Sequence, residues 1–436
     1  MCVAPAGTAP LLSKRAEIYQ AGLQTKGAAS STKGEARFVL DLLVELIGDK
    51  PVNEVDADDI LKFQRAIAFW PVNIGRRKDF KEMKKLDVIK RGKAERLPRI
   101  DRTTQGRHMK TLITFFNACQ RSRQLTANPC DSFSLKDFKD RIFRKKDRFS
   151  DDDLATLFDP AKAQELTHPL LYWGPMIELY SSMRVNEVAQ LFLEDVQCME
   201  FMEKGVKRRI HFFNITDSGE GQHVKSGYSL RGMPIHSKLL DLGFLEYVED
   251  VKKTGAKHLF PGLSWNDNRP GKTLSDWFNK NHLRKVCGIE DRRKTLHCFR
   301  HTTNTLADRS QVSKGVMRSI NGHSDGSDID DRYYVTRATL SEAQEGLEKI
   351  DYPTLNLLPY APGRFDEYLR HAVAQDNLFA NLIKEGKPLP RRAGWSSKAT
   401  SAMSSKSKGS KAKASVAGPT PAANLSSGPS VEALLE

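Results

Sequence analysis

The chain has 436 residues, 39% of them hydrophobic, which is enough for two or three domains with buried cores. Its 69 lysines and arginines outnumber its 54 aspartates and glutamates, and the formal charge of +15 favours a polyanionic partner. Six scattered cysteines without a CxxC pair argue against a disulfide framework and against a Cys/His metal site. The sequence shows neither an apolar run long enough for a bilayer nor the pattern of a signal peptide, so we expect a cytoplasmic protein.

Helical periodicity dominates the first part of the chain. Residues 11–24 have helical composition, and residues 38–47 carry apolar side chains at helical spacing. Asp56 is suited to cap the next helix, and Thr103 introduces a further one. Between these two helices lies the strongly basic segment 76–102, which is either a solvated helix face or a DNA-facing insertion; charge runs more often face water.

The part of the chain after residue 149 mixes helices with a small sheet. Ser150 followed by three aspartates is typical of a helix N-terminus, and residues 169–180 are apolar enough for a buried helix. Residues 208–215 and 230–236 read as antiparallel strands. Further helices are expected at residues 273–286, 295–309, 314–321 and 340–349. The predicted fold class is mainly α with a small antiparallel β-sheet.

One segment of this second part concentrates side chains suited to phosphate chemistry. The stretch LHCFRHT contains His297 and Arg300 one turn apart, and His323 and the adjacent Tyr333 and Tyr334 follow it. Arginine presents a planar fork of donors to phosphate oxygens, histidine moves protons near neutral pH, and a tyrosine oxygen can act as a covalent nucleophile. This combination works without a metal and points to a phosphodiester as the target.

Two candidate positions precede this segment. Arg184 lies one turn before Glu187, and Lys225 stands at the boundary of a predicted strand and turn. The order Arg, Lys, His-x-x-Arg, Gly-His, Tyr resembles the tyrosine recombinase (phage integrase) family, and the layout matches over roughly residues 30–352. The resemblance implies a site-specific DNA recombinase or integrase that cleaves and rejoins strands through a 3′-phosphotyrosine, integrating or excising a phage or other mobile element.

The resemblance also implies partners and surroundings. The substrate would be double-stranded DNA, bound by a homotetramer with accessory DNA-bending proteins, in the bacterial nucleoid or a phage-infected host. No cofactor and no metal would be needed, because the reaction is a transesterification whose bond energy is kept in the protein–DNA linkage.

Carried over residue by residue, the resemblance assigns a role to each position. Arg184 and Arg300 would clamp the non-bridging oxygens of the scissile phosphate, where charge accumulates in the transition state. Lys225 would protonate the leaving 5′ oxygen. His297 would accept or share the proton of the tyrosine, and His323 would add a hydrogen bond to the phosphate.

The nucleophile is a choice between two adjacent tyrosines. Tyr334 is preferred because it falls six residues before Leu340, a spacing that resembles integrases, and Tyr333 is the alternative. Glu187 would support the site from behind the residues that touch the phosphate.

The chain departs from the family pattern at two places. The usual Thr-Gly before the first arginine is replaced by Ser181, Ser182 and Met183, and Asn321 stands before Gly-His where an apolar residue is common. Both departures are next to catalytic positions without replacing one, so they affect local geometry rather than the set of reactive groups.

Other classes of enzyme fit the sequence less well. A metal-dependent nuclease needs clustered carboxylates, but Asp328, Asp330 and Asp331 are neighbours that point in different directions on a helix. The Gly-Lys-Thr triplet at 271–273 ends like a phosphate loop, yet Asn266 occupies the place of its first glycine. Two alternatives remain open: a type IB-like DNA topoisomerase, and a catalytically inert DNA-binding protein on the same scaffold.

The segments are predicted in the following order: an N-terminal arm and helix (residues 1–28), an all-helical core DNA-binding domain (29–135), a basic linker (136–149), a catalytic domain (150–352), a C-terminal helical extension (353–386) and a disordered basic tail (387–436). The tail is assigned by composition, since serine, alanine, lysine, glycine and proline dominate it and large apolar residues are almost lacking.

Overall fold

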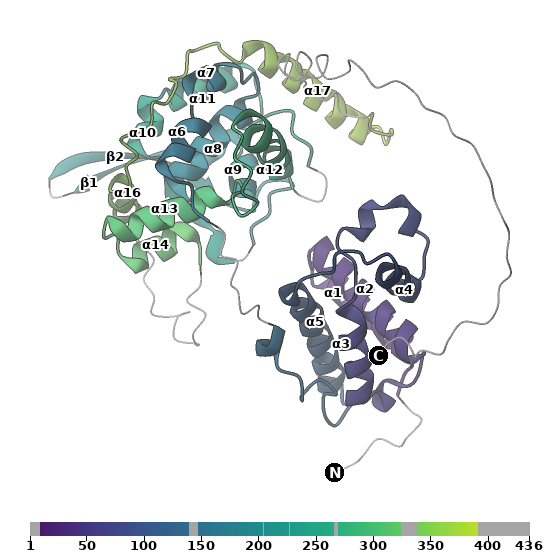
Figure 1. Cartoon of the computed structure of the whole chain (residues 1–436). Coiled ribbons are helices and arrows are strands. Elements are labelled where there is room, and N and C mark those ends of the chain that lie inside the picture. Colours follow the sequence, from purple (N-terminus) through teal and green to yellow (C-terminus); the bar gives the residue numbers. More distant parts are fainter. Residues whose placement is uncertain are drawn as a thin grey trace. The chain divides into compact units, whose positions relative to one another are not determined.

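The computed structural model divides the chain into two compact units that meet in sequence between Phe143 and Arg144 (Figure 1). The structure describes residues 9–138, 147–203, 205–225, 227–265, 269–323 and 338–390. Most of the predicted basic tail therefore lies outside the described residues, as do parts of the N-terminal arm and of the linker. Within the described ranges, none of the helices is long and apolar enough to cross a membrane.

The first unit is built from helices around one apolar core. Its elements are α1 (Leu12–Thr25), α2 (Ser30–Ile47), α3 (Ala57–Ile67), α4 (Lys85–Ala94) and α5 (Arg102–Arg121), with short 3-10 turns at Val52–Glu54, Ile74–Arg76, Lys78–Phe80 and Leu135–Phe138. Large side chains without solvent exposure fill the centre, among them Phe63, Leu112, Phe115 and Phe116. Burial of these apolar side chains is the main contribution to the stability of the unit, because each one removes a large apolar area from water.

Local capping chemistry sets where these helices begin. The side chain of Asp56 accepts a hydrogen bond from the backbone N–H of Asp59 at 2.9 Å and caps α3, as the sequence predicted. Helix α5 begins at Arg102 rather than after Thr103, because the carboxylate of Asp101 accepts from the amide of Thr104 at 2.6 Å and serves as the N-cap.

The basic segment 76–102 folds into α4 and two 3-10 turns. Its Arg91 is paired within the unit: Nη2 lies 2.9 Å from a carboxylate oxygen of Asp79, and Nε lies 2.6 Å from Glu95. The same guanidinium lies over the ring of Phe80, 4.3 Å from its centroid. Part of the charge in this segment is thus neutralised by neighbouring acids.

The second unit contains the sheet and most of the helices. The helices are α6 (Asp151–Leu157), α7 (Pro160–Gln164), α8 (Pro169–Ser181), α9 (Val185–Ala189), α10 (Ser237–Asp241), α11 (Phe244–Lys253), α12 (Gly271–Trp277), α13 (Cys298–Arg309), α14 (Lys314–Asn321), α16 (Leu340–Glu348) and α17 (Asp366–Lys384), together with a π-helix at Phe278–Val286 and 3-10 turns at Leu193–Asp195 and Gly227–Ser229. The predicted helix at residues 273–286 is therefore split between α12 and the π-helix.

The sheet has three antiparallel strands in the order β1-β2-β3. They are β1 (Val196–Glu203), β2 (Val206–Ile215) and β3 (Arg231–Pro234), with Cys198 opposite His211 and Phe213 opposite Met233. Strands β2 and β3 confirm the two predicted strands, whereas β1 was not predicted. The predicted fold class, mainly α with a small antiparallel sheet, is confirmed.

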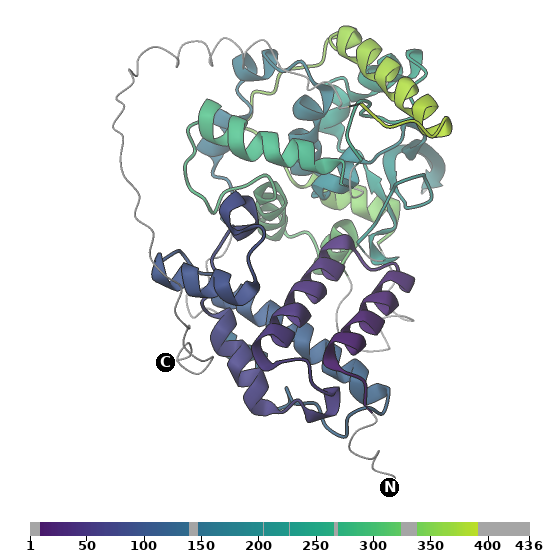
Figure 2. The same ribbon diagram turned by 90° about the vertical axis from the view of Figure 1, so that its right-hand side faces the viewer.

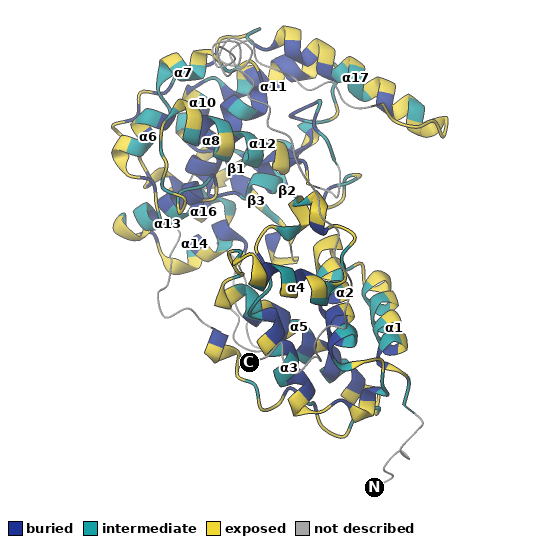
Figure 3. Cartoon of the chain, turned by 45° about the vertical axis from the view of Figure 1, so that its right-hand side comes forward, coloured by how far each residue is buried: buried dark blue, intermediate teal, exposed yellow. Residues whose placement is uncertain are grey.

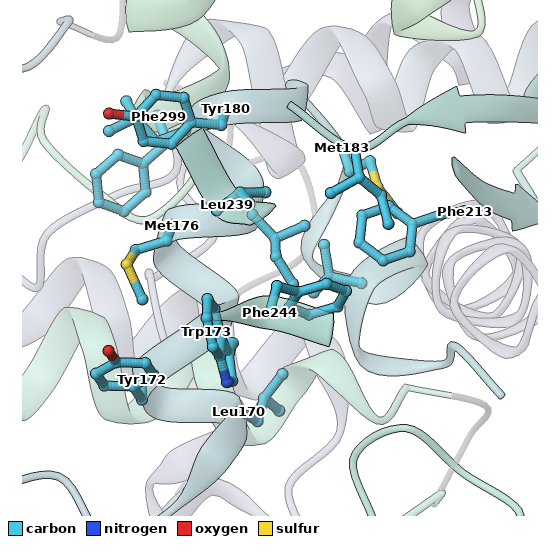
Figure 4. Packing of buried hydrophobic residues seen from close by; sticks show 14 of the residues in the cluster. Leu170, Tyr172, Trp173, Met176, Tyr180, Met183, Phe213, Leu239, Phe244 and Phe299 are labelled. Atoms are coloured by element: carbon cyan, nitrogen blue, oxygen red, sulfur yellow. The ribbon is translucent and has the colours of Figure 1, made fainter. Parts of the chain in front are cut away.

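Helix α8 runs through the core of the second unit. Nearly all of its residues are buried, and Trp173 packs edge-on against the ring of Phe244 at 5.1 Å between centroids (Figure 4). Tyr180, the residue before the last one of the helix, is also buried. Dense packing around α8 therefore places its C-terminal end, where Ser182 follows, next to the core.

The two C-terminal helices, α16 and α17, differ in how far they are buried in the unit. The apolar stripe of α16 packs within the unit, since Ala343 and Leu347 are buried and the helix contacts α14 and β3. Helix α17 lies at the periphery of the unit (Figure 2), and much of its later part is exposed (Figure 3). Leu378 and Ile383 are among its exposed residues. The stripe of α16 is thus accounted for by intramolecular packing.

Candidate functional site

Arg300 is a buried arginine held by backbone carbonyl groups. It lies in the first turn of α13, with only 5% of its surface exposed. Its Nη1 donates to the carbonyl oxygen of Ser182 at 2.6 Å, and its Nη2 donates to the carbonyl oxygen of Asn321 at 2.6 Å. The same Nη2 lies 3.0 Å from Nε2 of His323. The planar fork is therefore fixed by the C-terminal ends of α8 and α14.

His323 is placed by the glycine that ends α14. Gly322 has φ 57°, in the left-handed region, and a Cβ there would lie 2.9 Å from Nη1 of Arg231 and 3.1 Å from Cα of Ser229. Backbone conformation and space both require glycine at this position. At the Gly-His pair the chain thus turns so that the imidazole of His323 lies next to the guanidinium of Arg300.

Glu187 joins two arginines at the start of α9. Its carboxylate accepts from the backbone N–H of Arg184 at 3.0 Å and from Nη1 of the same residue at 2.5 Å. Oε2, the oxygen that accepts from this backbone N–H, also accepts from Nη2 of Arg231 at 3.0 Å. Glu187 is therefore the acid that ties the predicted Arg184 to a further arginine on β3.

Arg231 and Arg300 are both held by carbonyl groups at the C-terminal end of α14. Nε of Arg231 donates to the carbonyl oxygen of Ile320 at 2.9 Å, and Nη1 donates to that of Ser229 at 2.7 Å. Ile320 and Asn321 are consecutive residues in the last turn of α14, where carbonyl groups lack helical partners. The C-terminal end of α14, which the helix dipole makes negative, thus holds two guanidinium groups side by side.

The electrostatic balance of this cluster is positive. Burial opposes the ionisation of Glu187, but Arg231 and Arg184 outweigh it and hold its pKa below the usual value. Burial and the nearby charge of Arg184 lower the pKa of Arg300 to about 9. Burial, followed by Arg300 and other cations, also lowers the pKa of His323. Since positive charges repel one another here, a bound anion would relieve the repulsion.

Lys225 and His297 border the cluster. Lys225 is exposed in the connection between β2 and β3, and its charge is among the causes that lower the pKa of His323. His297 is exposed at the N-cap position of α13, three residues before Arg300, and its ring makes an edge-on contact with His301 at 5.1 Å. Both predicted side chains are thus exposed to solvent.

The structure brings together the predicted Arg184, Glu187, Arg300 and His323. The proposed nucleophile Tyr334 and its alternative Tyr333 lie outside the described residues, and so do the three aspartates at 328, 330 and 331. Among the residues that the structure does describe, no group of histidine, cysteine, aspartate and glutamate side chains could hold a metal ion.

Two charged residues of the site were missed from the sequence. Arg231 follows Lys225 closely and lies on a predicted strand, which hinted at a place near the site. Nothing in the sequence, however, distinguished it from many other basic residues. Glu178 lies in α8, one turn before Ser182, and is fully buried. Burial raises the pKa of Glu178 well above its usual value, partly offset by Arg300. A single acid within an otherwise apolar helix was the available signal.

The Gly-Lys-Thr triplet serves packing in this structure. A Cβ on Gly271 would lie 2.8 Å from the carbonyl oxygen of Val185, and the amide of Gly271 donates to Oδ1 of Asn186 at 3.2 Å. The glycine thus lets α12 approach the first turn of α9, which contains Glu187.

No protein-family model matches the chain, and no curated protein does either. Among solved structures, the chain is similar to a lambda integrase dimer bound to a COC′ core site, with 16% identity over 75% of this chain and 96% of that chain and a TM-score of 0.46. It is also similar to the Tn1549 transposon integrase in complex with transposon right end DNA, with 16% identity, coverage of 77% and 99%, and a TM-score of 0.46. The integrase from mycobacterium phage Brujita is 14% identical, with coverage of 83% and 97% and a TM-score of 0.30.

Proposed function

We propose that the protein is a site-specific DNA recombinase of the tyrosine type. The observation that carries the proposal is the clamp of Arg300: a buried guanidinium fixed by two carbonyl groups, next to His323 and within the field of Arg184 and Arg231. A preorganised positive site of this kind stabilises the charge that develops on a phosphate during transfer.

The proposed reaction is a metal-independent transesterification. The phenolic oxygen of Tyr334, or of Tyr333, attacks the phosphorus; the new bond joins tyrosine to the 3′ phosphate while the bond to the 5′ oxygen breaks. Arg184 and Arg300 hold the non-bridging oxygens, and His297 takes the phenolic proton. Lys225 gives a proton to the leaving 5′ oxygen. The reverse steps, with a second strand supplying the 5′ hydroxyl, rejoin the DNA.

The proposed partners follow from this reaction. Exchange between two duplexes needs four cuts, so a homotetramer on double-stranded DNA, with accessory DNA-bending proteins, is proposed for integration or excision of a mobile element. The first unit then corresponds to the core DNA-binding domain and the second to the catalytic domain. Its place of action would be the cytoplasm, in the nucleoid or in a phage-infected host.

Covalent capture of DNA tests the proposal. The full chain is incubated, in the presence of EDTA, with a library of duplexes that have randomised core sequences and a nick, so that the short fragment with the released 5′ hydroxyl diffuses away. We expect a protein–DNA adduct that resists denaturant and is lost in Tyr334→Phe. If the adduct is lost in Tyr333→Phe instead, Tyr333 is the nucleophile. If it persists in both variants, the proposal of a tyrosine recombinase is refuted.

The same assay separates the two alternatives. A type IB-like topoisomerase would relax supercoiled plasmids of unrelated sequence, whereas a recombinase forms its adduct on a narrow set of sequences selected from the library. An inert DNA-binding protein would retain library DNA without any covalent product.

A further inference from the structure

The two places where the sequence departs from the family pattern touch each other in the folded chain. Ser182 follows α8 and Asn321 ends α14, and the hydroxyl of Ser182 donates to Oδ1 of Asn321 at 2.9 Å. Both residues are buried, with 0% and 5% of their surface exposed. The residues 139 positions apart in sequence thus form a direct side-chain link between the ends of two helices.

A third side chain completes a closed set of hydrogen bonds. Nδ2 of Asn321 donates to Oδ1 of Asn304 at 2.6 Å, and Nδ2 of Asn304 lies 3.2 Å from Oγ of Ser182 and 3.4 Å from Oδ1 of Asn321. Each polar atom of the three side chains therefore has a partner within the set. Such a satisfied network favours a single arrangement, because removing one member takes a hydrogen-bond partner from each of the other two.

Arg300 stands at the centre of this set. The carbonyl groups that hold its guanidinium belong to Ser182 and Asn321, the two residues whose side chains are linked. Asn304 lies one turn further along α13, and its Nδ2 donates to the carbonyl oxygen of Arg300 at 2.6 Å. Every member of the set is thus bonded to the main chain or the side chain of the same arginine.

The backbone at Ser182 adds a second observation. Its φ of 59° and ψ of 16° are left-handed, a conformation that costs a residue with a Cβ and that glycine adopts freely. The chain nevertheless has a serine there, and its hydroxyl is used in the network. The strain is therefore compensated by the hydrogen bonds that the hydroxyl makes.

We propose that Ser182, Asn304 and Asn321 are positioning residues that fix the separation of the two carbonyl groups holding Arg300, and hence the place of its guanidinium over the scissile phosphate. The inference rests on the proposed recombinase function. Loss of one of these side chains weakens the direct link between the ends of α8 and α14, which Arg300 also bridges through the two carbonyl groups. Small movements of these ends then misplace the clamp, and misplacement of a charged donor slows the chemical step more than it weakens binding.

Single-turnover cleavage of the nicked duplex by the full chain tests the proposal, with the rate constant at saturating DNA and the half-saturating DNA concentration measured separately. In Asn304→Ala we expect the rate constant to fall by about 10-fold or more, which equals about 1.4 kcal/mol of activation free energy, with the half-saturating concentration changed by less than about 3-fold. Ser182→Gly loses the hydroxyl but removes the backbone strain of a left-handed serine. It should likewise lower the rate constant with little change in the half-saturating concentration, and it is the variant to use if Asn304→Ala does not fold.

Thr303→Val is the matched control. Thr303 is buried, adjacent to Asn304 on α13, and its hydroxyl donates to the carbonyl oxygen of Leu179 on α8 at 2.7 Å without touching the clamp. We expect this variant to keep the cleavage rate constant even if it lowers stability. An equal fall in Thr303→Val and Asn304→Ala would overturn the proposal, because the effect would then be general loosening of α13.

A spectroscopic readout keeps this test separate from the proposed function. The nitrogen resonance of Nε2 of His323 reports its hydrogen bond from Arg300 whether or not DNA is cleaved. It should shift in Asn304→Ala and stay unchanged in Thr303→Val. An unchanged resonance in Asn304→Ala overturns the positioning role, whereas lack of a covalent adduct in the unaltered protein overturns the recombinase function alone.

Discussion

Nη2 of Arg300 and Nε2 of His323 lie 3.0 Å apart at the edge of the cation cluster. A guanidinium can only donate, so Nε2 of the histidine must accept, and the proton of the neutral ring resides on Nδ1. The lowered pKa of His323, caused by burial and then by the neighbouring cations, agrees with a neutral ring. The two residues proposed to bind a phosphate are thus bonded to each other.

Arg300→Lys should abolish most of the cleavage activity while the protein still folds. A lysine can replace only one of the donors that now reach Ser182 and Asn321, so the remaining charge would be displaced from the phosphate. We expect the cleavage rate constant to fall by about 100-fold or more, the range found when one preorganised donor to a developing oxyanion is removed. Adduct formation on the nicked duplex measures it, with circular dichroism as the check of folding. A cleavage rate constant within a few-fold of that of the unaltered protein would contradict the proposed role of Arg300 in holding the phosphate.

Anion binding should raise the pKa of His323. The folded-state pKa is now lowered by burial and by Arg300, Arg184 and other cations, so an anion that cancels their field favours the protonated ring. The anion complex then takes up protons, and affinity should increase as pH falls through the raised pKa toward the pKa of the anion-free protein. Histidine NMR with added sulfate measures this shift, with chloride at equal ionic strength as the control. An unchanged or lower pKa in sulfate would show that the cluster is not an anion site.

Glu187→Gln should destabilise the second unit. The substitution leaves Arg231 buried without its acid, which typically costs about 3–5 kcal/mol of the free energy of unfolding. The pKa of Glu187 is lowered in the folded state, so its contribution is complete above the usual value of 4.5 and is lost as pH falls through the folded-state pKa. Urea unfolding should therefore show a constant difference from the unaltered protein near neutral pH and a smaller one in acid. Glu187→Asp is the control that keeps the charge.

Local chemistry decided which parts of the fold the sequence could predict. The cap of α3 depends on Asp56 and its immediate neighbours, and the start of α6 depends on Ser150 with Asp153, whose amide donates to the serine hydroxyl at 3.1 Å. Strand β1 was missed because its charged and sulfur-containing sequence becomes a strand only through pairing with β2. That pairing is non-local and leaves little trace in the composition of β1.

The same distinction applies to the site. Arg184, Glu187, Arg300 and His323 were predicted because their types and order resemble a known motif, and the structure brings them together. The carbonyl groups of Ser182 and Asn321 could not be predicted, since every residue has a carbonyl and only the fold determines which ones face the guanidinium. The two departures from the motif were visible in the sequence, but their contact with each other was not.

Glu178→Gln should stabilise the protein at alkaline pH relative to the unaltered chain. Burial raises the pKa of Glu178 well above its usual value, so its stabilising contribution is complete below the unfolded-state value of about 4.5 and is lost as pH rises toward the folded-state pKa. The amide has the same shape and does not titrate. Unfolding free energies measured between pH 6 and about pH 9 should therefore decline less in the variant. A steeper decline in Glu178→Gln would mean that the carboxylate is ionised and paired with Arg300.

Gly271→Ala should disturb the site from a distance. The new Cβ would lie 2.8 Å from the carbonyl oxygen of Val185, a backbone atom that cannot rotate away, so α12 must move from the first turn of α9. We expect a loss of about 1–3 kcal/mol of stability, typical of overpacking, and slower cleavage because Arg184 and Glu187 are at that turn. Gly315→Ala is the matched control, since a Cβ in this turn of α14 meets nothing within 4 Å, and replacing glycine in a helix stabilises by about 0.4–1 kcal/mol. Equal stability of the two variants by thermal unfolding would contradict the close approach of α12 to α9.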